Sequence, residues 1–352
     1  MNLDPNEKWG QKRGCFTTNR TVSFTNWNQA VWSQCLYNCA TSGFFFAALH
    51  SIHCMCLKKN EHDQFTNVDD RRCVTDCPFD YFGKQCGGEN GEISLYRTMR
   101  LDDRCSSVNL GSPHQFNKIM LASHPGSGNT WTRYLIEKAS GYYTGSVADD
   151  NSLYNGGFKG EFEKENGGTV IVVKAHRYVK SGASAILLIR NPYEAIMSEL
   201  NRRRGHGHTS HADSKEFYTQ FWRDLVRQES GRWFNLYRQY IENKEVKIVY
   251  FEDLKGDLRH TMTDTIKFIE NMNNHTLHVT DKNDRIDCLV IDSQGEFKRE
   301  KKTLEFDPYE IDETMIPRVN NFITLLNETL IHKQLQTIPT YYLKENKTNT
   351  DD

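Results

Sequence analysis

The chain has 352 residues, a formal net charge of −2 and 26% charged residues, which suits one enzyme-sized domain with a small additional module. A protein that binds the nucleic-acid backbone normally carries a strong basic excess, so this balance argues against a nucleic-acid partner. Composition otherwise indicates only a globular protein.

Cysteines are concentrated near the N-terminus. Eight of the ten fall within the first 86 residues, and the other two are Cys105 and Cys288. A dense, even set in a short segment indicates a disulfide framework formed in an oxidising compartment. A metal site is the weaker alternative, because no CxxC pair recurs at zinc-finger spacing. The pairing of the eight stays open, and we expect Cys105 to pair with Cys288.

Four Asn-X-Thr sequons agree with that compartment, at Asn19, Asn274, Asn327 and Asn346. However, residues 1–10 are too polar for a signal peptide, and no apolar run reaches the roughly 18 to 20 residues that span a bilayer. We therefore expect that an N-terminal anchor or signal is absent from this chain. A cytosolic protein with reduced thiols is the alternative.

Two regions meet near residue 100. We expect a disulfide-rich module over residues 10–98, a linker over 99–114, a larger domain over 115–343 and a polar, disordered tail over 344–352. The aromatic residues of the module can line a sugar site or form its core. They are Trp27, Trp32, Tyr37, Phe44, Phe45 and Phe46.

The larger region contains four short apolar runs, at residues 118–123, 169–174, 185–189 and 246–251. Continuous hydrophobicity predicts strands buried on both faces, as in a parallel sheet. Apolar residues between them repeat every four positions, which predicts one apolar face per helix. These residues are Phe217, Phe221 and Leu225, then Trp233, Tyr237 and Ile241. The pattern predicts an α/β fold with its ligand at the carboxyl ends of the strands.

The first of these strands is followed by a glycine-containing loop, His124 to Thr130. Gly126 and Gly128 tolerate positive φ, which exposes backbone N–H groups, and the helix expected from Trp131 directs its positive end to the same place. Side-chain donors come from Ser127, Asn129 and Thr130. The loop predicts a phosphate site, with a plain strand-to-helix turn as the alternative. It lacks the Gly-Lys-Ser/Thr ending of a nucleoside triphosphate loop, which argues against a kinase or NTPase.

Polar residues also end the next two strands. Arg190 closes a buried strand, and Asn191 with Pro192 forms a good helix start, so that Ser198 lies two turns along and faces back toward Arg190. A guanidinium and a hydroxyl suit a second phosphate, with a solvated arginine and an ordinary helical serine as the alternative. Lys174 and His176 lie on one side of a strand end by period two, where histidine suits proton abstraction and lysine neutralises a leaving group.

The ordered set resembles the signature of sulfotransferases that use 3′-phosphoadenosine 5′-phosphosulfate (PAPS). It comprises Pro125, Ser127, Gly128, Thr130 and Trp131, then Lys174 and His176, then Arg190 and Ser198. The resemblance covers about residues 115 to 300. It implies the sulfotransferase fold, a P-loop-like parallel sheet flanked by helices. The reaction that it implies requires no metal.

The resemblance also implies a role for each residue. The loop from Ser123 to Thr130 would hold the 5′-phosphosulfate, and Trp131 would stack on adenine. Arg190 and Ser198 would hold the 3′-phosphate, and His176 would be the general base. A late basic run with Lys298 and Arg299 would cover the 3′-phosphate, with a solvated charge run as the alternative. Phe251 stands where the family often has tyrosine. Gly126 stands where many relatives have lysine, and we favour Lys174 over His124 and Arg133 as the replacement charge.

The N-terminal cysteine pattern, with Cys54-Met-Cys56 and Cys86-Gly87-Gly88, is similar to WSC domains, which are small carbohydrate-binding modules. A WSC module before this domain resembles the animal WSC-domain-containing sulfotransferases. The resemblance implies a Golgi type II membrane protein that sulfates glycans, with sialic acid as the acceptor. A binding protein that lost activity is the alternative, supported by Gly126.

A basic segment follows the helix of Ser198. It contains Arg202, Arg203 and Arg204, then His206, His208 and His211. We expect a mobile loop that attracts an acidic sugar, or else a merely solvated charge run.

Overall fold

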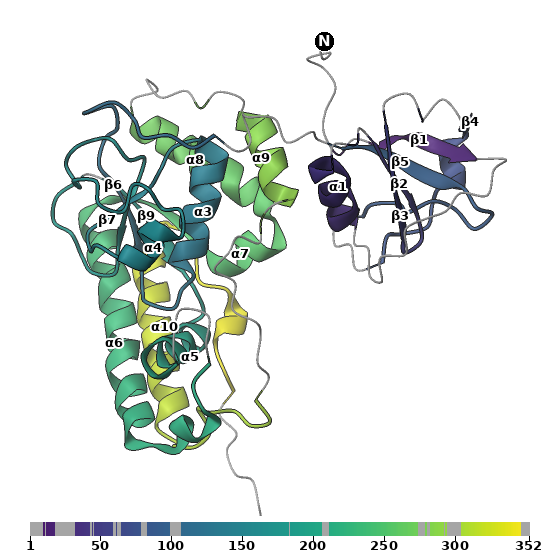
Figure 1. Ribbon diagram of the computed structural model, residues 1–352. Coiled ribbons are helices and arrows are strands. Elements are labelled where there is room, and N and C mark those ends of the chain that lie inside the picture. Colours follow the sequence, from purple (N-terminus) through teal and green to yellow (C-terminus); the bar gives the residue numbers. More distant parts are fainter. Residues whose placement is uncertain are drawn as a thin grey trace, which may run out of the picture. The chain divides into compact units, whose positions relative to one another are not determined.

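The structure is a computed structural model that describes residues 10, 12–17, 32–42, 44, 46–58, 61, 65–78, 83–98, 107–182, 184–205, 211–273, 279, 282–291, 293 and 304–345. The chain divides into two compact units (Figure 1). The smaller comprises Met1–Ser107 with Asp281–Ser293, and the larger comprises Val108–Thr280 with Gln294–Asp352. The segment around α9 (Lys282–Ile291) therefore groups with the N-terminal unit, although we expected one continuous domain over 115–343.

In its described residues the smaller unit contains an antiparallel sheet and the helices α1 (Trp32–Thr41) and α9. Its strands lie in the order β3-β2-β5-β1-β4. Their bounds are β1 Lys12–Thr17, β2 Phe46–His50, β3 His53–Leu57, β4 Thr66–Val68 and β5 Ile93–Arg97. A 3-10 turn, η2, covers Asp70–Arg72. The indole of Trp32 is buried against Tyr96, so this aromatic residue belongs to the core. Trp27 and Phe45 lie outside the described residues.

Disulfides hold this unit together, as predicted. The bonds are Cys15–Cys73, Cys35–Cys54, Cys39–Cys56 and Cys77–Cys86. Because all eight sulfurs are paired, the metal-site alternative has no free thiolates there. Cys288 is also disulfide-bonded, while Cys105 lies outside the described residues.

The larger unit is built on a parallel sheet in the order β10-β9-β6-β8-β7, which confirms the α/β prediction. Its strands are β6 Ile119–Ser123, β7 Gly145–Ser146, β8 Val173–Ala175, β9 Ser184–Ile189 and β10 Glu245–Tyr250. One predicted strand was too long: in the run 169–174 only the last two residues belong to β8. The two-residue strand β7 was not predicted, because such a short segment carries no periodicity.

Helices flank this sheet (Figure 1). They are α3 Asn129–Ser140, α4 Asn151–Asn155, α5 Pro192–Arg204, α6 Gln220–Asn243, α7 Phe251–Gly256, α8 Leu258–Met272 and α10 Met315–His332, with 3-10 turns η3 Ser214–Tyr218 and η4 Thr340–Tyr342. The two expected apolar faces lie on one 24-residue helix, α6, except that Phe217 belongs to η3. Helices α6 and α10 pack side by side, and their apolar faces join the strands in one core.

The described parts of the expected linker and tail both pack on the larger unit. In the linker, the N–H groups of Gly111 and His114 donate to the carbonyl groups of Thr169 and Gly167, so this segment packs on the larger unit. At the other end, Lys344 bonds Asp307 and Asn320, whereas residues 346–352 lie outside the described part.

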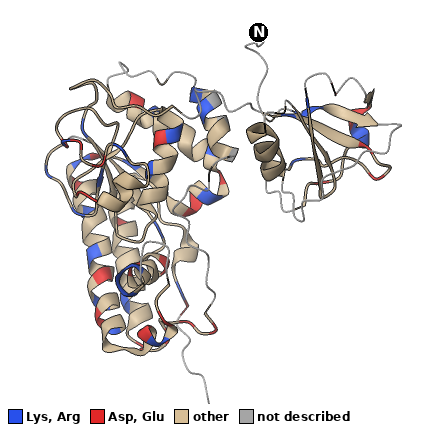
Figure 2. Ribbon diagram, viewed as in Figure 1, with Lys and Arg blue, Asp and Glu red and all other residues tan. Residues whose placement is uncertain are grey.

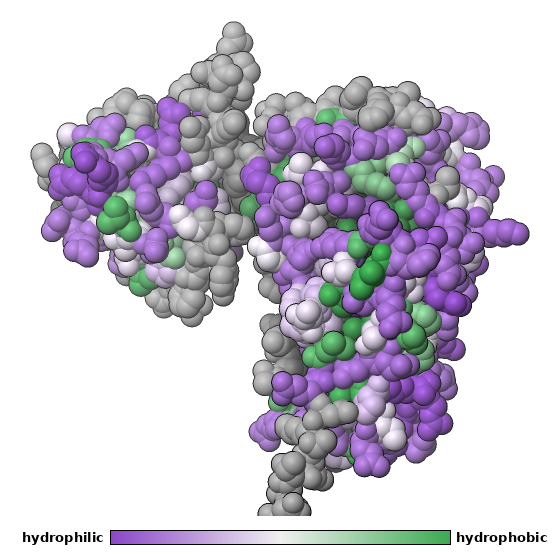
Figure 3. Space-filling model, turned by 180° about the vertical axis from the view of Figure 1, so that it is seen from behind, coloured by the Kyte–Doolittle hydropathy of each residue, from purple (hydrophilic) through white to green (hydrophobic). Residues whose placement is uncertain are grey.

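The surface of the larger unit is predominantly hydrophilic in the view of Figure 3, with small separate apolar groups. Acidic and basic residues alternate along α6 in Figure 2, in agreement with the small net charge. Among the described residues, no helix combines the length and apolar character needed to cross a bilayer. The sequon Asn327 lies half-buried within α10 rather than in a loop, and the other three sequon asparagines lie outside the described residues.

Candidate active site

The predicted phosphate loop connects β6 to α3 at the carboxyl edge of the sheet. Gly126 and Gly128 adopt φ angles of 81° and 91°, a region that favours glycine. Gly128 caps α3 without a side-chain hydrogen bond. Within the described part of the chain, the N–H groups of Gly128, Asn129 and Thr130 have no backbone acceptor. These free donors at a helix N-terminus form the arrangement that binds phosphate groups.

The three predicted side-chain donors of the loop differ in orientation. Asn129 turns inward, since its Nδ2 donates to Ser123 Oγ at 2.9 Å. Ser127 is fully buried, whereas Thr130 is half-buried. Asn129 therefore braces the loop against β6, a role that sequence spacing alone does not distinguish from phosphate binding.

The missing loop lysine has a steric reason. A Cβ atom on Gly126 would lie 2.3 Å from the carbonyl oxygen of Ala195 and 3.1 Å from the backbone nitrogen of Glu199. Both belong to the backbone of α5, which cannot move aside as a flexible side chain can. Gly126 thus permits the loop to touch α5.

Arg190 and Ser198 lie at this same contact. The Nη1 of Arg190 donates to the carbonyl oxygen of Gly126 at 2.8 Å, and Ser198 Cβ would lie 3.1 Å from a Cβ on Gly126. Asn191 caps α5 with Pro192 at its first turn, as predicted. The Nε of Arg190 is buried without a hydrogen-bond partner among the described residues, which leaves a donor for an anion.

Phe251, to which sequence reasoning gave no role, forms a wall beside the loop. Its ring lies 2.4 Å from where a Cβ on Gly128 would be, so Gly128 is required here as well. The guanidinium carbon of Arg190 lies over the Phe251 ring, 4.7 Å from its centroid. The rings of Trp131 and Phe251 are T-shaped, with their centroids 5.5 Å apart. In the sequence, the only signal for Phe251 was its position, where the resembling family often has tyrosine.

His176 follows β8 and is oriented by the end of β6. Its Nδ1 lies 2.8 Å from the carbonyl oxygen of Ser123, which can only accept, so Nδ1 carries the proton and Nε2 keeps its lone pair. Partial burial, with the charges of Lys174 and His124, lowers the pKa of His176 to about 4 despite the opposing hydrogen bond to Ser123. The lowered pKa makes the ring neutral at pH 7, and more than a third of the residue faces solvent, so the ring is accessible.

Three residues were candidates to supply the positive charge that a loop lysine would carry, and two of them are paired with buried carboxylates. Arg133 is fully buried, with Nη1 2.6 Å from Glu161 and Nε bonded to Thr144. His124 is buried with Nε2 2.9 Å from Glu229. The side-chain ammonium of Lys174 has no hydrogen bond or ion pair with any described residue, and burial together with the charge of Arg133 lowers its pKa.

The arginine segment is not the mobile loop that we expected. Arg202, Arg203 and Arg204 form the last turn of α5. Arg202 and Arg203 both bind buried Glu199, and Arg204 lies 3.4 Å from Glu216. The physical reason is that buried carboxylates require paired cations, and these arginines supply them. His206 and His208, like Lys298 and Arg299 of the late basic run, lie outside the described residues.

One family model matches part of the larger unit, beyond the phosphate loop. The model for the sulfotransferase domain matches residues 172–309, which include Lys174, His176, Arg190 and Ser198. The larger unit is therefore a sulfotransferase-type α/β domain.

Three similar chains are named as members of the WSCD family. WSCD family members from Aedes aegypti, Drosophila pseudoobscura pseudoobscura and Drosophila melanogaster are 33%, 32% and 32% identical over 198, 231 and 210 residues. These matches cover 54%, 62% and 57% of this chain and 59%, 70% and 62% of those proteins. The chain belongs to the WSCD, or WSC-domain-containing, family.

Two solved structures are also similar. A sulfotransferase from Alicyclobacillus acidocaldarius has 14% identity and a TM-score of 0.35, covering 64% of this chain and 98% of that one. Mouse sulfotransferase SULT7A1 complexed with PAP has the same identity and TM-score, covering 67% and 92%.

Proposed function

We propose that the protein transfers a sulfuryl group from PAPS to a hydroxyl group of a glycan in the secretory pathway, with sialic acid as the preferred acceptor. The single observation that carries the reaction is the orientation of His176, whose Nδ1–H is held by Ser123 while Nε2 is left free to accept a proton. A bound donor substrate would place its 5′-phosphosulfate at the loop and its 3′-phosphate beside Arg190 and Ser198.

The chemistry requires mainly positioning and charge. The acceptor hydroxyl gives its proton to His176 while its oxygen bonds to sulfur, and the bond from sulfur to the bridging phosphate oxygen breaks. The product nucleotide, 3′-phosphoadenosine 5′-phosphate (PAP), leaves with the added negative charge, which Lys174 is available to stabilise.

The donor test is a binding titration with PAP against ATP. We expect PAP to bind more tightly, because Arg190 and Ser198 suit a 3′-phosphate and the loop lacks the lysine of ATP sites. Tighter binding of ATP would contradict the proposal.

The acceptor test is transfer of radioactive sulfate from PAPS to matched glycans with and without sialic acid. Label on the sialylated glycan alone supports the full proposal. Label on both contradicts the sialic acid preference, and PAP binding with no transfer to any glycan favours the inactive binding protein.

A further inference from the structure

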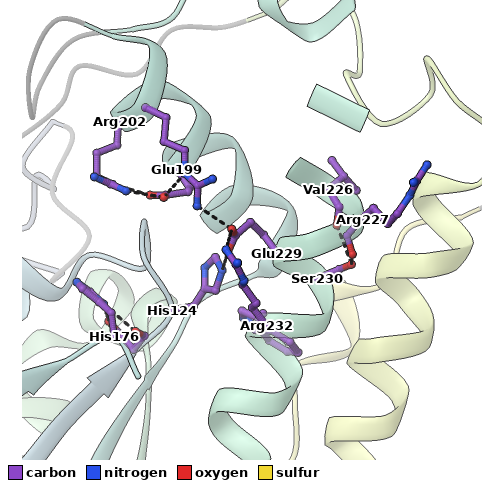
Figure 4. Close-up of polar contacts among 12 residues, drawn as sticks. His124, His176, Glu199, Arg202, Val226, Arg227, Glu229, Ser230 and Arg232 are labelled. Carbon is purple, nitrogen blue, oxygen red and sulfur yellow. Dashed lines mark hydrogen bonds and ion pairs between the residues drawn. The ribbon is translucent and has the colours of Figure 1, made fainter. Parts of the chain in front are cut away.

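A chain of hydrogen bonds and ion pairs, which holds two buried carboxylates, runs from the phosphate loop to the end of α5. His124, the first loop residue, places Nε2 2.9 Å from Glu229 of α6. Glu229 also contacts Arg203 at 2.7 Å, and Arg203 contacts Glu199 at 2.6 Å. Figure 4 shows His124 and Glu229 facing each other between the strand end and α6.

The two carboxylates lie deep in the protein. Glu199 and Glu229 have exposed side-chain fractions of 0% and 2%. Burial acts to raise the pKa of Glu229, but His124, Arg203 and Arg232 outweigh it and bring the value to about 2. Burial likewise acts to raise the pKa of Glu199, and Arg202 and Arg203 overcome it and lower the value. Both groups are ionised at neutral pH, so each needs its partners.

These pairs join the two places where the donor's phosphates would bind. His124 starts the loop of the 5′ end, while Glu199 follows Ser198 directly and has its backbone nitrogen against Gly126. Tyr237 of α6 supports the same loop, since its hydroxyl accepts from the N–H of His124 at 3.0 Å. Loss of one pair would therefore let the loop and α5 shift relative to each other.

We infer that Glu229 and Arg203 are positioning residues that hold the loop and α5 in register, so that one nucleotide engages both phosphate sites together. The inference rests on the proposed function. Arg203, which the sequence suggested for binding an acidic acceptor sugar, would thus position the binding site of the donor instead.

The test compares the dissociation constants of PAP and 5′-AMP, which lacks the 3′-phosphate. In the Glu229→Gln and Arg203→Lys variants, we expect the preference for PAP over AMP to fall about tenfold, a typical size for coupling between two sites. A general loss of stability would weaken both ligands and would leave their ratio unchanged. The matched control is Glu242→Gln, which removes an exposed ion pair with Arg238 from the same helix.

The outcomes separate the two claims. Suppose the unmodified protein prefers PAP, and both variants either weaken the binding of PAP and AMP equally or leave both affinities unchanged. The inference is then overturned and the proposed function stands. If the unmodified protein shows no preference for PAP, the proposed function fails and takes this inference with it. Thermal unfolding of each variant shows whether it folds. If Glu229→Gln does not fold, Arg203→Lys carries the test, because the side chain of Arg203 is 30% exposed and lysine keeps the positive charge.

Discussion

The imidazole Nδ1 of His176 lies 2.8 Å from the backbone carbonyl oxygen of Ser123, the last residue of β6. Because that oxygen is part of the central strand, the orientation of the ring is set by the sheet itself. The free Nε2 is the group that the proposed reaction needs.

Replacing His176 by Gln should therefore lower kcat by about 10²-fold to 10⁴-fold and leave the affinity for PAP within about twofold. Steady-state transfer assays and PAP titration measure the two effects. A variant with near-normal turnover would remove His176 from the role of general base.

The pH profile offers an independent check on His176. Its pKa of about 4 lies below the ordinary 6.5, so the neutral, active form persists down to about pH 4. The acid limb of kcat/KM attributable to this group should fall near pH 4 and not near 6.5. Since the unfolded chain binds the proton between these values, the same difference lowers stability as pH falls from 6.5 to 4.

Lys174→Ala should reduce turnover by about 10²-fold or more while PAP still binds, because the ammonium would act mainly on charge that develops during transfer. The control is Lys159→Ala, which removes an exposed lysine of the same unit that stacks on Tyr154. Single-turnover transfer and PAP titration give the comparison. Unchanged turnover in Lys174→Ala would mean that another group neutralises the leaving phosphate.

A lysine in place of Gly126 should harm the protein. Gly126→Lys, and also Gly126→Ala, place a Cβ 2.3 Å from the carbonyl oxygen of Ala195, which forces the loop away from α5. The control Gly157→Ala shares the positive φ but meets no atom within 4 Å, so it shows only the backbone cost of about 1 to 2 kcal/mol. We expect a larger loss of melting temperature and of PAP affinity at Gly126. Equal losses at the two positions would contradict the steric explanation.

Arg190→Lys should weaken PAP by about tenfold or more and 5′-AMP much less, since lysine lacks the planar fork of donors and the stacking on Phe251. Competition titrations of the two nucleotides measure this. The control Arg204→Lys changes an arginine that stacks on Phe221 at the far end of α5. A similar loss for both nucleotides would argue that Arg190 supports the loop and does not hold the 3′-phosphate.

Local patterns in the sequence determined much of this protein. Continuous apolar runs predicted the buried parallel strands, cysteine density predicted the disulfide unit, and Asn191-Pro192 predicted the start of α5. The ordered motif indicated Lys174, His176, Arg190 and Ser198. The first three lie at the ends of parallel strands, which meet at one edge of the sheet, and Ser198 lies on the helix that follows.

Only the tertiary structure decided how those residues are used. Three contacts depend on which buried groups face one another. Gly126 touches Ala195, Arg133 pairs with Glu161, and Arg202 and Arg203 pair with Glu199. A run of arginines looks the same in sequence whether it faces solvent or neutralises a buried carboxylate. Burial makes the difference, because an ionised carboxylate removed from water must find its cations within the protein.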